Sequence, residues 1–397
     1  EMDTEIDSKW ANEFSLVQGG PLFQLFVRSR LSTTAMDWMK RRVIVFSMLT
    51  WLPLCLLTAL SGQAIDGHIQ IPFLFDIEVH VRFLLALPLL LFAEWVVHQR
   101  LRPVVGQFIS RGIVAADTRP RFEACIASAL RLRNALWLEL GLIAFVFMVG
   151  HGLFFEQIAI NATTWYVSGS EAGLKLTPAG YWLAYVSLPI YQFVFLRWIF
   201  RILIWCRFLW QVARLDLRLI ATHPDRAGGL GFLGQSAAAF MPFLVANGAL
   251  LSGMIAERIL YNEALLTDFK IEIASVTLFL VLLVLAPMVV FVPLLAKTKR
   301  HGLMVYGGLA SDYVRAFDEK WAQAEKLTDE PFLGTSDIQS LADLANSFEV
   351  IRTMRLFPFS KQTALQITLV SLLPLSPLLL TMISLEELVQ RVIGILL

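Results

Sequence analysis

The chain has 397 residues, of which 57% are hydrophobic and 16% are charged, and its mean hydropathy is +0.64. Soluble domains carry about a quarter charged residues, so this composition indicates an integral membrane protein. A net charge of +1 excludes the basic excess typical of nucleic-acid-binding proteins, and the three separated cysteines have no zinc-ligand spacing. We therefore expect membrane lipids as partners, and no nucleic acid, cofactor or metal.

Residues 1–42 mix apolar and basic side chains without the continuous apolar stretch of a cleavable signal peptide. They predict a cytoplasmic amphipathic arm that lies at the membrane interface. Seven later stretches are apolar over about 20 residues, the length needed to cross a bilayer. These predicted spans cover residues 43–61, 80–98, 135–156, 180–205, 236–256, 273–296 and 364–383.

The loops between the predicted spans differ in charge. Segments 1–42, 98–134, 206–235 and 297–363 together hold 26 Lys and Arg residues, whereas the alternate loops hold four. Because cytoplasmic loops collect Lys and Arg, we expect the N-terminus in the cytoplasm and the C-terminus outside. The sequence thus predicts an all-α polytopic protein with about seven transmembrane helices, in the plasma membrane or, in a prokaryote, the inner membrane.

The polar segments predict a cytoplasmic helical layer that is continuous with the spans. Within it, Ser336 and Gln339 form a capping box at the start of an amphipathic helix. We expect the layer to join the subunits of a homo-oligomer, and 297–363 also suits a cytoplasmic protein partner. The sequence predicts four regions. They are the arm (1–42), the first six spans (43–296) with cytoplasmic segments 99–134 and 206–235, a further cytoplasmic segment (297–363), and the last span with a short outer tail (364–397).

Several ionisable residues, among them Arg82, fall at membrane depth, where they are costly and usually face a cavity or a partner. Glu94 and Glu139 are expected about one turn inside the cytoplasmic face, where snorkelling to the interface explains them. His151 lies deeper, between two glycines, with Glu156 a turn and a half later. These two could relay protons or bind a substrate, or His151 could form a structural hydrogen bond to a neighbouring helix.

Five arginines follow one side of the fourth predicted span and its extension into the cytoplasm: Arg197, Arg201, Arg207, Arg214 and Arg218. Their spacing is too irregular for a voltage sensor, which places arginines every third residue through the membrane. Snorkelling and contact with lipid headgroups explain them most simply. The alternative is a cytoplasmic vestibule that attracts anions.

The least apolar stretch after the fourth span reads His-Pro-Asp-Arg-Ala-Gly-Gly-Leu-Gly, from His223 to Gly231. The tripeptide resembles the signature with which J-domains engage Hsp70-type chaperones, but the flanking soluble helices of a J-domain are replaced by membrane spans. Because Pro224 disfavours helix at His223 and the glycines permit positive φ, we predict a structured elbow. The elbow could also bind an anionic ligand or lipid headgroup. The residues expected at such a contact are His223, Asp225, Arg226, Gly228, Gly229, Arg214 and Arg218.

The last span contains Pro374 and Pro377 around Ser376, which frees backbone carbonyls in mid-membrane. The fifth span is rich in small and polar residues, among them Asn247 and Ser252. Packing kinks explain both features. The alternative is a pore or substrate path along spans five to seven, lined by these five residues together with His151 and Glu156.

Three classes of function remain open. The broken spans and intramembrane charges favour an oligomeric channel or transporter for a small ion or solute. Its layout of seven spans with a cytoplasmic N-terminus is similar to that of insect chemoreceptor channels, although no motif is shared. A non-catalytic scaffold or signalling subunit is the first alternative, and an inner-leaflet lipid or phosphate-ester enzyme centred on His223-Pro224-Asp225-Arg226 is the second. No catalytic motif is present, so we assign no catalytic residues and lean against an enzyme.

Overall fold

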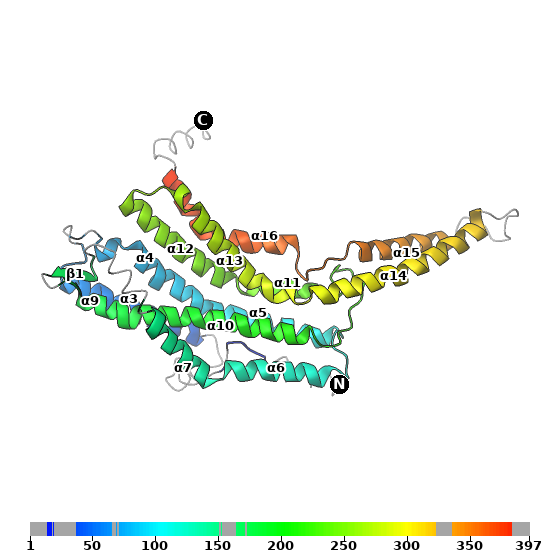
Figure 1. The fold of residues 1–397 in the computed structure, drawn as a ribbon, viewed down its shortest axis with the longest axis horizontal. Helices are drawn as coiled ribbons and strands as arrows, with labels where there is room; N and C mark the ends of the chain where they lie inside the picture. Colours follow the sequence, from blue (N-terminus) through cyan, green and yellow to red (C-terminus); the bar gives the residue numbers. More distant parts are fainter. Residues whose placement is uncertain are drawn as a thin grey trace.

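The computed structural model describes residues 14–17, 19, 37–65, 69, 71–150, 152, 164–170, 173–322 and 336–382, and these are mostly helical (Figure 1). The α-helices are α3 (Asp37–Leu60), α4 (Ile77–His80), α5 (Leu87–Ser110), α6 (Arg119–Arg133), α7 (Leu136–Phe145), α9 (Pro178–Trp182), α10 (Leu188–Val212), α11 (Gly234–Ala239), α12 (Met241–Asn262), α13 (Lys270–Val289), α14 (Val292–Phe317), α15 (Ser336–Arg352) and α16 (Lys361–Leu372). The 3₁₀ helices are η1 (Phe73–Phe75), η5 (Gly231–Leu233), η6 (Leu266–Phe269) and η8 (Leu373–Met382), and the π-helical segments are η2 (Val81–Ala86), η3 (Val146–Gly150), η4 (Leu183–Ser187) and η7 (Asp318–Ala322). One antiparallel hairpin pairs β1 (Val167–Ser170) with β2 (Gly173–Leu176).

Five of the described helices are long and apolar enough to cross a membrane, and a sixth span results if α6 and α7–η3, which meet at a 45° bend, are counted together. The five are Met39–Leu60, Ile77–Ser110, Met241–Asn262, Leu266–Val289 and Lys361–Met382. The chain is therefore a membrane-embedded, predominantly α-helical protein, as its composition predicted. The structure has five or six such helices where the sequence predicted seven.

The difference in span number lies in the predicted spans 135–156 and 180–205. The first of these is described as a helix over Leu136–Gly150, and it bends away from α6. The second lies in one helical run, α9–η4–α10, which extends from Pro178 to Val212 but is not among the five apolar helices. Tyrosine, tryptophan and arginine side chains dilute its apolar content, because this run faces other helices rather than lipid over much of its length.

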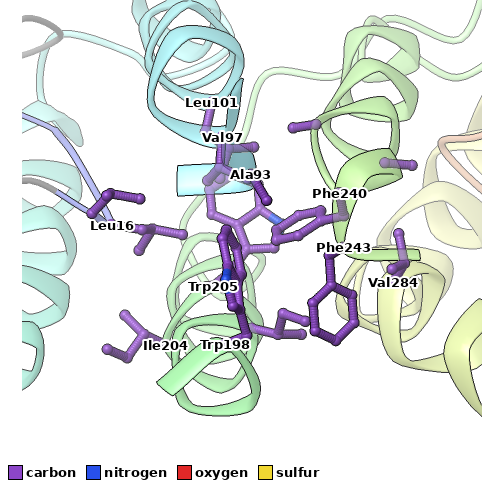
Figure 2. Close-up of a cluster of buried hydrophobic side chains, with 14 of the residues drawn as sticks. Leu16, Ala93, Val97, Leu101, Trp198, Ile204, Trp205, Phe240, Phe243 and Val284 are labelled. Atoms are coloured by element: carbon purple, nitrogen blue, oxygen red, sulfur yellow. The ribbon is translucent and has the colours of Figure 1, made fainter. Parts of the chain in front are cut away.

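The packing centre of the molecule surrounds α10 (Figure 2). Trp198 and Trp205 are fully buried there, between Ala93 and Val97 of α5 and Phe243 of α12. The indole nitrogen of Trp198 donates to the backbone oxygen of Leu90 at 2.9 Å, which satisfies its polar atom in an apolar surrounding. These side chains fill the space between α5, α10 and α12, so this part of the protomer is closed.

The pair α14 and α15 projects away from the bundle, to the right in Figure 1, while β1, α4 and α9 lie at the opposite end. α14 starts with Pro293 in its first turn, where the missing N–H of proline costs nothing. α15 begins at Ser336, the residue at which the sequence predicted a helix start. The two helices pack against each other along the projection.

The arm predicted over 1–42 lies mostly outside the described residues, but Phe14 to Val17 are placed and fully or nearly buried. Phe14 contacts the rings of Trp205 and Phe208 on α10, with centroids 6.2 and 5.2 Å apart. The short piece that is described therefore inserts into the core. The outer tail after Met382 lies outside the described residues.

Candidate functional site

Five charged side chains from four helices meet inside the bundle, and we call them the inner charge cluster: Arg42 (α3), Glu94 (α5), Glu139 (α7), Arg197 and Arg201 (α10). Glu94 is their centre. Its carboxylate lies 2.8 Å from Arg42 and 2.8 Å from Arg201, and 3.9 Å from Arg197. Arg197 also lies 3.7 Å from Glu139.

All members of the inner charge cluster are at most 9% exposed, so water does not screen them. Removing charges from water costs several kcal/mol per ion, and only close opposite charges offset it. Snorkelling to the interface is therefore wrong as the explanation of Glu94, Glu139, Arg197 and Arg201. Each of these side chains turns inward because a counter-charge on a neighbouring helix is available there.

The rest of the predicted arginine series behaves differently. Arg207 is exposed and donates to Ser128 on α6. α10 ends at Val212, so Arg214 and Arg218 are not on the helix with Arg197, and the prediction of one shared helical side is wrong for them. Both are exposed, and Arg214 lies over the ring of Trp210 at 3.5 Å.

A second group of charges lies before α5 begins, around α4 and η2 and the facing part of α12, and we call it the outer carboxyl cluster: Asp76, Glu78, Arg82 and Glu257. Asp76 caps the helix by accepting from the amide of Val79 at 2.8 Å. Arg82 pairs with Glu78 one turn away, and Glu257 of α12 accepts from the amide of Glu78 at 3.3 Å. Three acids thus share one arginine.

The carboxyl group of Asp76 is only 5% exposed, and it accepts from the indole nitrogen of Trp165 at 2.8 Å. Burial raises the pKa of Asp76, the hydrogen bonds from Val79 and Trp165 lower it, and Glu78 raises it further, so that the pKa lies above its usual 3.8. A raised pKa means that the folded state binds the proton more tightly than the unfolded state. This residue therefore favours folding at low pH, and that contribution is lost as the pH rises through the folded pKa.

The elbow is a loop organised around the side chain of Asp225. Its carboxylate accepts from the amides of Ala227 at 2.8 Å, Gly229 at 3.1 Å and Gly231 at 2.8 Å. Gly228 and Gly229 have φ values of 65° and 96°, and Arg226 has 53°, which turn these amides toward one point. Of the two glycines predicted at an anion contact, Gly228 and Gly229, the amide of Gly229 is thus already bonded to the protein's own carboxylate.

His223 and Arg355 complete the elbow. Nδ1 of His223 lies 2.9 Å from the Asp225 carboxylate. Arg355, which follows α15, donates its guanidinium to the backbone oxygen of Asp225 at 2.8 Å and its amide to that of Arg226 at 2.7 Å. The elbow therefore joins the 206–235 segment to the end of the 297–363 segment, while the Arg226 side chain remains exposed.

We expect the elbow to loosen in acid. Burial works to raise the pKa of Asp225, but the hydrogen bonds from Ala227, Gly231 and Gly229 outweigh it and hold the pKa below its usual 3.8. The stabilisation is present above the unfolded pKa and is lost as the pH falls through the folded pKa. Hydrogen exchange of residues 223–234, measured against α12 at decreasing pH, checks this; equal protection of both segments down to the lowest pH would contradict it.

Of the residues predicted to line a path, Asn247, Ser252, Pro374, Ser376 and Pro377 lie among the described residues. Asn247 donates to the backbone oxygen of Phe243 on its own helix at 2.7 Å, and Ser252 is half-buried. The chain changes from α16 to the 3₁₀ helix η8 at Leu373, beside Pro374, and Ser376 and Pro377 point away from the bundle. His151 and Glu156 lie outside the described residues.

Gly248 of α12 shows why the fifth predicted span carries small residues. A Cβ built there would lie 2.3 Å from the backbone oxygen of Ser371 and 3.2 Å from Cγ of Pro374. We expect Gly248→Ala to lower the free energy of unfolding by about 1–3 kcal/mol, because α12 and α16 must separate. Thermal unfolding in detergent measures this loss.

Gly308 provides the matched control for that substitution. It lies inside α14, and no atom is within 4 Å of a Cβ built there. Gly308→Ala is expected to be neutral or to stabilise by up to about 1 kcal/mol, because alanine is the better helix former. Equal behaviour of the two variants would contradict the close contact of α12 with α16.

The outer carboxyl cluster was missed by sequence reasoning, apart from Arg82, which was singled out at membrane depth. Asp76 and Glu257 are 181 positions apart and each resembles an ordinary helix-end acid. Among the described residues, no group of three or more His, Cys, Asp or Glu side chains is arranged to hold a metal ion. The cluster therefore consists of three acidic side chains that neighbour one arginine and one tryptophan.

The described residues also form an apolar groove of about 530 Å³ between α13 and α16. Ile273, Thr277 and Val281 line one side and Thr368 and Leu372 line the other. Comparisons with known protein families, with curated proteins and with solved structures find no match to this chain.

Proposed function

We propose that the protein conducts or transports a small ion or solute across the membrane, and that the inner charge cluster lies on its route. The observation that carries this proposal is the cluster itself: five buried charged side chains that face the bundle interior, four of which fall within predicted spans. Intramembrane charges are expensive and commonly mark ion and substrate pathways. A purely structural role would be met at lower cost by apolar side chains of similar size.

The balance of charge favours an anion as the transported species. Three arginines face two glutamates, which leaves one positive charge in the cluster. Nη2 of Arg201 is buried and has no hydrogen-bond partner among the described residues. A buried donor without an acceptor costs about 1–3 kcal/mol, and an anion would satisfy it.

The closed packing around Trp198 implies that transport requires a rearrangement of α10 against α5 and α12. We place the cytoplasm at the end of the molecule that carries α14 and α15, because the basic segments 98–134, 206–235 and 297–363 are expected there. The same rule places the outer carboxyl cluster on the opposite side. A plasma membrane, or the inner membrane of a prokaryote, is the expected location.

Flux through purified protein in liposomes tests the proposal. We expect anion efflux from vesicles that contain the wild type, and a loss of it in the double variant Glu94→Gln with Arg201→Met, which removes one negative and one positive charge and so keeps the net charge of the cluster. Arg207→Met is the matched control, since Arg207 is on the same helix but exposed. Absence of flux for the wild type, over a range of small anions and cations, would refute transport.

If the route instead runs along spans five to seven, we expect a different result in the same flux assay. If the route runs there, within an oligomer that shelters Ser376 and Pro377, substitutions at Pro374, Ser376 and Pro377 change the flux more than the cluster variants do. His223→Ala is the reference, because the elbow is remote from both routes along the chain. An oligomeric structure with a symmetry axis lined by η8 would support this route.

A second candidate function, as a subunit that binds a partner through α14 and α15, is favoured by the exposed apolar side chains on this projection. Met304 is 78% exposed, and Val305, Leu309 and Ile338 are between 45% and 53% exposed. Such side chains on helices that leave the bundle are typical of a protein contact. The partner is either another copy of the chain or a cytoplasmic protein.

Substitutions on the projecting pair test this second candidate. Met304→Lys combined with Leu309→Lys is expected to lower the oligomeric mass measured by light scattering in detergent, or to abolish co-purification of a partner. Asp312→Asn on the same helix is the control, because its side chain is 77% exposed and polar. Unchanged mass and unchanged co-purification in the double variant would contradict a contact at this surface.

A further inference from the structure

The outer carboxyl cluster holds more acid than its surroundings neutralise. Glu257 and Asp76 accept from the adjacent backbone amides of Glu78, at 3.3 Å, and Val79, at 2.8 Å, so the two carboxyl groups meet at the same helix start. Arg82 is the cation that pairs with this group, through Glu78. Two neighbouring carboxyl groups repel each other when both are ionised, so binding of one proton by the pair is favoured.

A buried hydroxyl beside the cluster gives an independent sign of a ligand. Tyr191 of α10 is 6% exposed, and its hydroxyl has no hydrogen-bond partner among the described residues. The guanidinium of Arg82 lies 5.7 Å from the centre of the Tyr191 ring, so the phenol is next to the Arg82–Glu78 pair. A buried polar atom normally has a hydrogen-bond partner, so the Tyr191 hydroxyl marks a position that a proton donor or a water molecule would fill.

We propose that the outer carboxyl cluster is a proton-binding site, in which Asp76 and Glu257 share one exchangeable proton and the buried Tyr191 phenol lies beside the Arg82–Glu78 pair. Asp76 already accepts from two N–H groups, those of Val79 and Trp165, which suit a carboxylate. Glu257 accepts only the longer bond from the Glu78 amide. The shared proton therefore resides on Glu257 and is donated to Asp76.

Titratable and charged groups reach this site from every element that surrounds it. Protonation of the pair removes one negative charge and ties α12 to the start of α4; loss of the proton leaves adjacent carboxylates that repel each other across the same contact. The groups are Glu78, His80 and Arg82 on α4 and η2, Tyr166 before β1, Tyr191 on α10, and Glu257 and Tyr261 on α12.

This inference rests on the proposed function only for its consequence, which is that transport is coupled to a proton. An anion that is transported together with a proton carries less net charge across the membrane. In such a transport cycle the outer carboxyl cluster would bind the proton and the arginine-rich inner charge cluster would bind the anion. The site itself does not depend on transport. It is tested on the purified full chain in detergent.

Infrared difference spectra between mildly acidic and mildly alkaline buffer measure the protonated-carboxyl band directly. The wild type is expected to lose such a band as the pH is raised, and Glu257→Gln is expected to lack this change. Glu272→Gln is the matched control, because Glu272 begins the next helix but its side chain is 55% exposed. A titrating band that persists unchanged in Glu257→Gln would overturn the proposal.

Trp165→Phe keeps the test decisive if Glu257→Gln fails to fold. Removing the indole N–H takes away a hydrogen bond that favours the Asp76 carboxylate, so the midpoint of the titration is expected to rise by about one pH unit. An unmoved midpoint would also overturn the proposal.

Proton uptake by liposomes separates this inference from the proposed function. A titrating band without any flux would refute transport and leave the proton site standing. Flux without the band, and with a rate that does not depend on Glu257, would refute the proton site alone. Coupled uptake that is lost in Glu257→Gln and kept in Glu272→Gln supports both.

Discussion

Replacing Glu94 with alanine is expected to lower the free energy of unfolding by about 3–5 kcal/mol, the cost of leaving buried charges without their partner. The carboxylate holds Arg42 and Arg201 at 2.8 Å and lies 3.9 Å from Arg197, so without it three buried guanidinium groups lose an anionic acceptor. The loss is measured by thermal or chemical unfolding in detergent, followed with a dye that reacts with the buried thiol of Cys125.

The exposed pair of Arg352 and Glu349 gives a matched control. Its atoms are 2.7 Å apart, as close as those of the Glu94 pairs, but the two side chains are 69% and 47% exposed. Glu349→Ala is therefore expected to cost at most about 1 kcal/mol. Similar losses in the two alanine variants would show that burial does not determine the strength of the inner charge cluster.

Replacing Asp225 with alanine is expected to release the elbow and to cost about 3 kcal/mol or more. Three backbone amides, those of Ala227, Gly229 and Gly231, lose a charged acceptor, and each such bond contributes about 1.5–3 kcal/mol. Asp225→Asn retains one carbonyl oxygen, so its loss is expected to be smaller. Hydrogen exchange of residues 223–234 and thermal unfolding measure the two effects.

Asp216 is the control for the elbow, since it is a nearby exposed aspartate on the same connecting segment. Asp216→Ala is expected to leave both exchange and unfolding unchanged within about 0.5 kcal/mol. If Asp225→Ala exchanged no faster than Asp216→Ala, the carboxylate would not be the organising group of the loop. The elbow would then again be open to an external anion.

Much of the helical architecture follows from the sequence, because apolar runs and turn residues act locally. α15 starts at Ser336, where the sequence pattern predicted the start of a helix, and the glycines at 228 and 229 predict a turn with positive φ. The break of the last span follows from Pro374 and Pro377, which cannot donate backbone hydrogen bonds. The number of spans is harder to predict from the sequence, because α10 is covered by neighbouring helices and need not be apolar throughout.

The inner charge cluster could be predicted only in part. Glu94, Glu139, Arg197 and Arg201 are visible in the sequence as charges in or near apolar segments, but an isolated helix offers each of them an interface to reach. Their mutual attraction depends on which helices are adjacent, and Arg42 joins them from a helix more than fifty positions away. The packing of the helices decides which charged side chains come close together, so this proximity leaves no pattern in the local sequence.

The 3₁₀ helix η8 has a consequence for the reach of the last span. Residues in a 3₁₀ helix advance by about 2.0 Å each, against about 1.5 Å in an α-helix, so ten residues from Leu373 to Met382 extend about 20 Å instead of about 15 Å. Met241–Asn262 and Lys361–Met382 both have 22 residues. The second is therefore about 5 Å longer than an α-helix with the same number of residues, and a longer apolar segment fits a given bilayer by tilting further from the membrane normal.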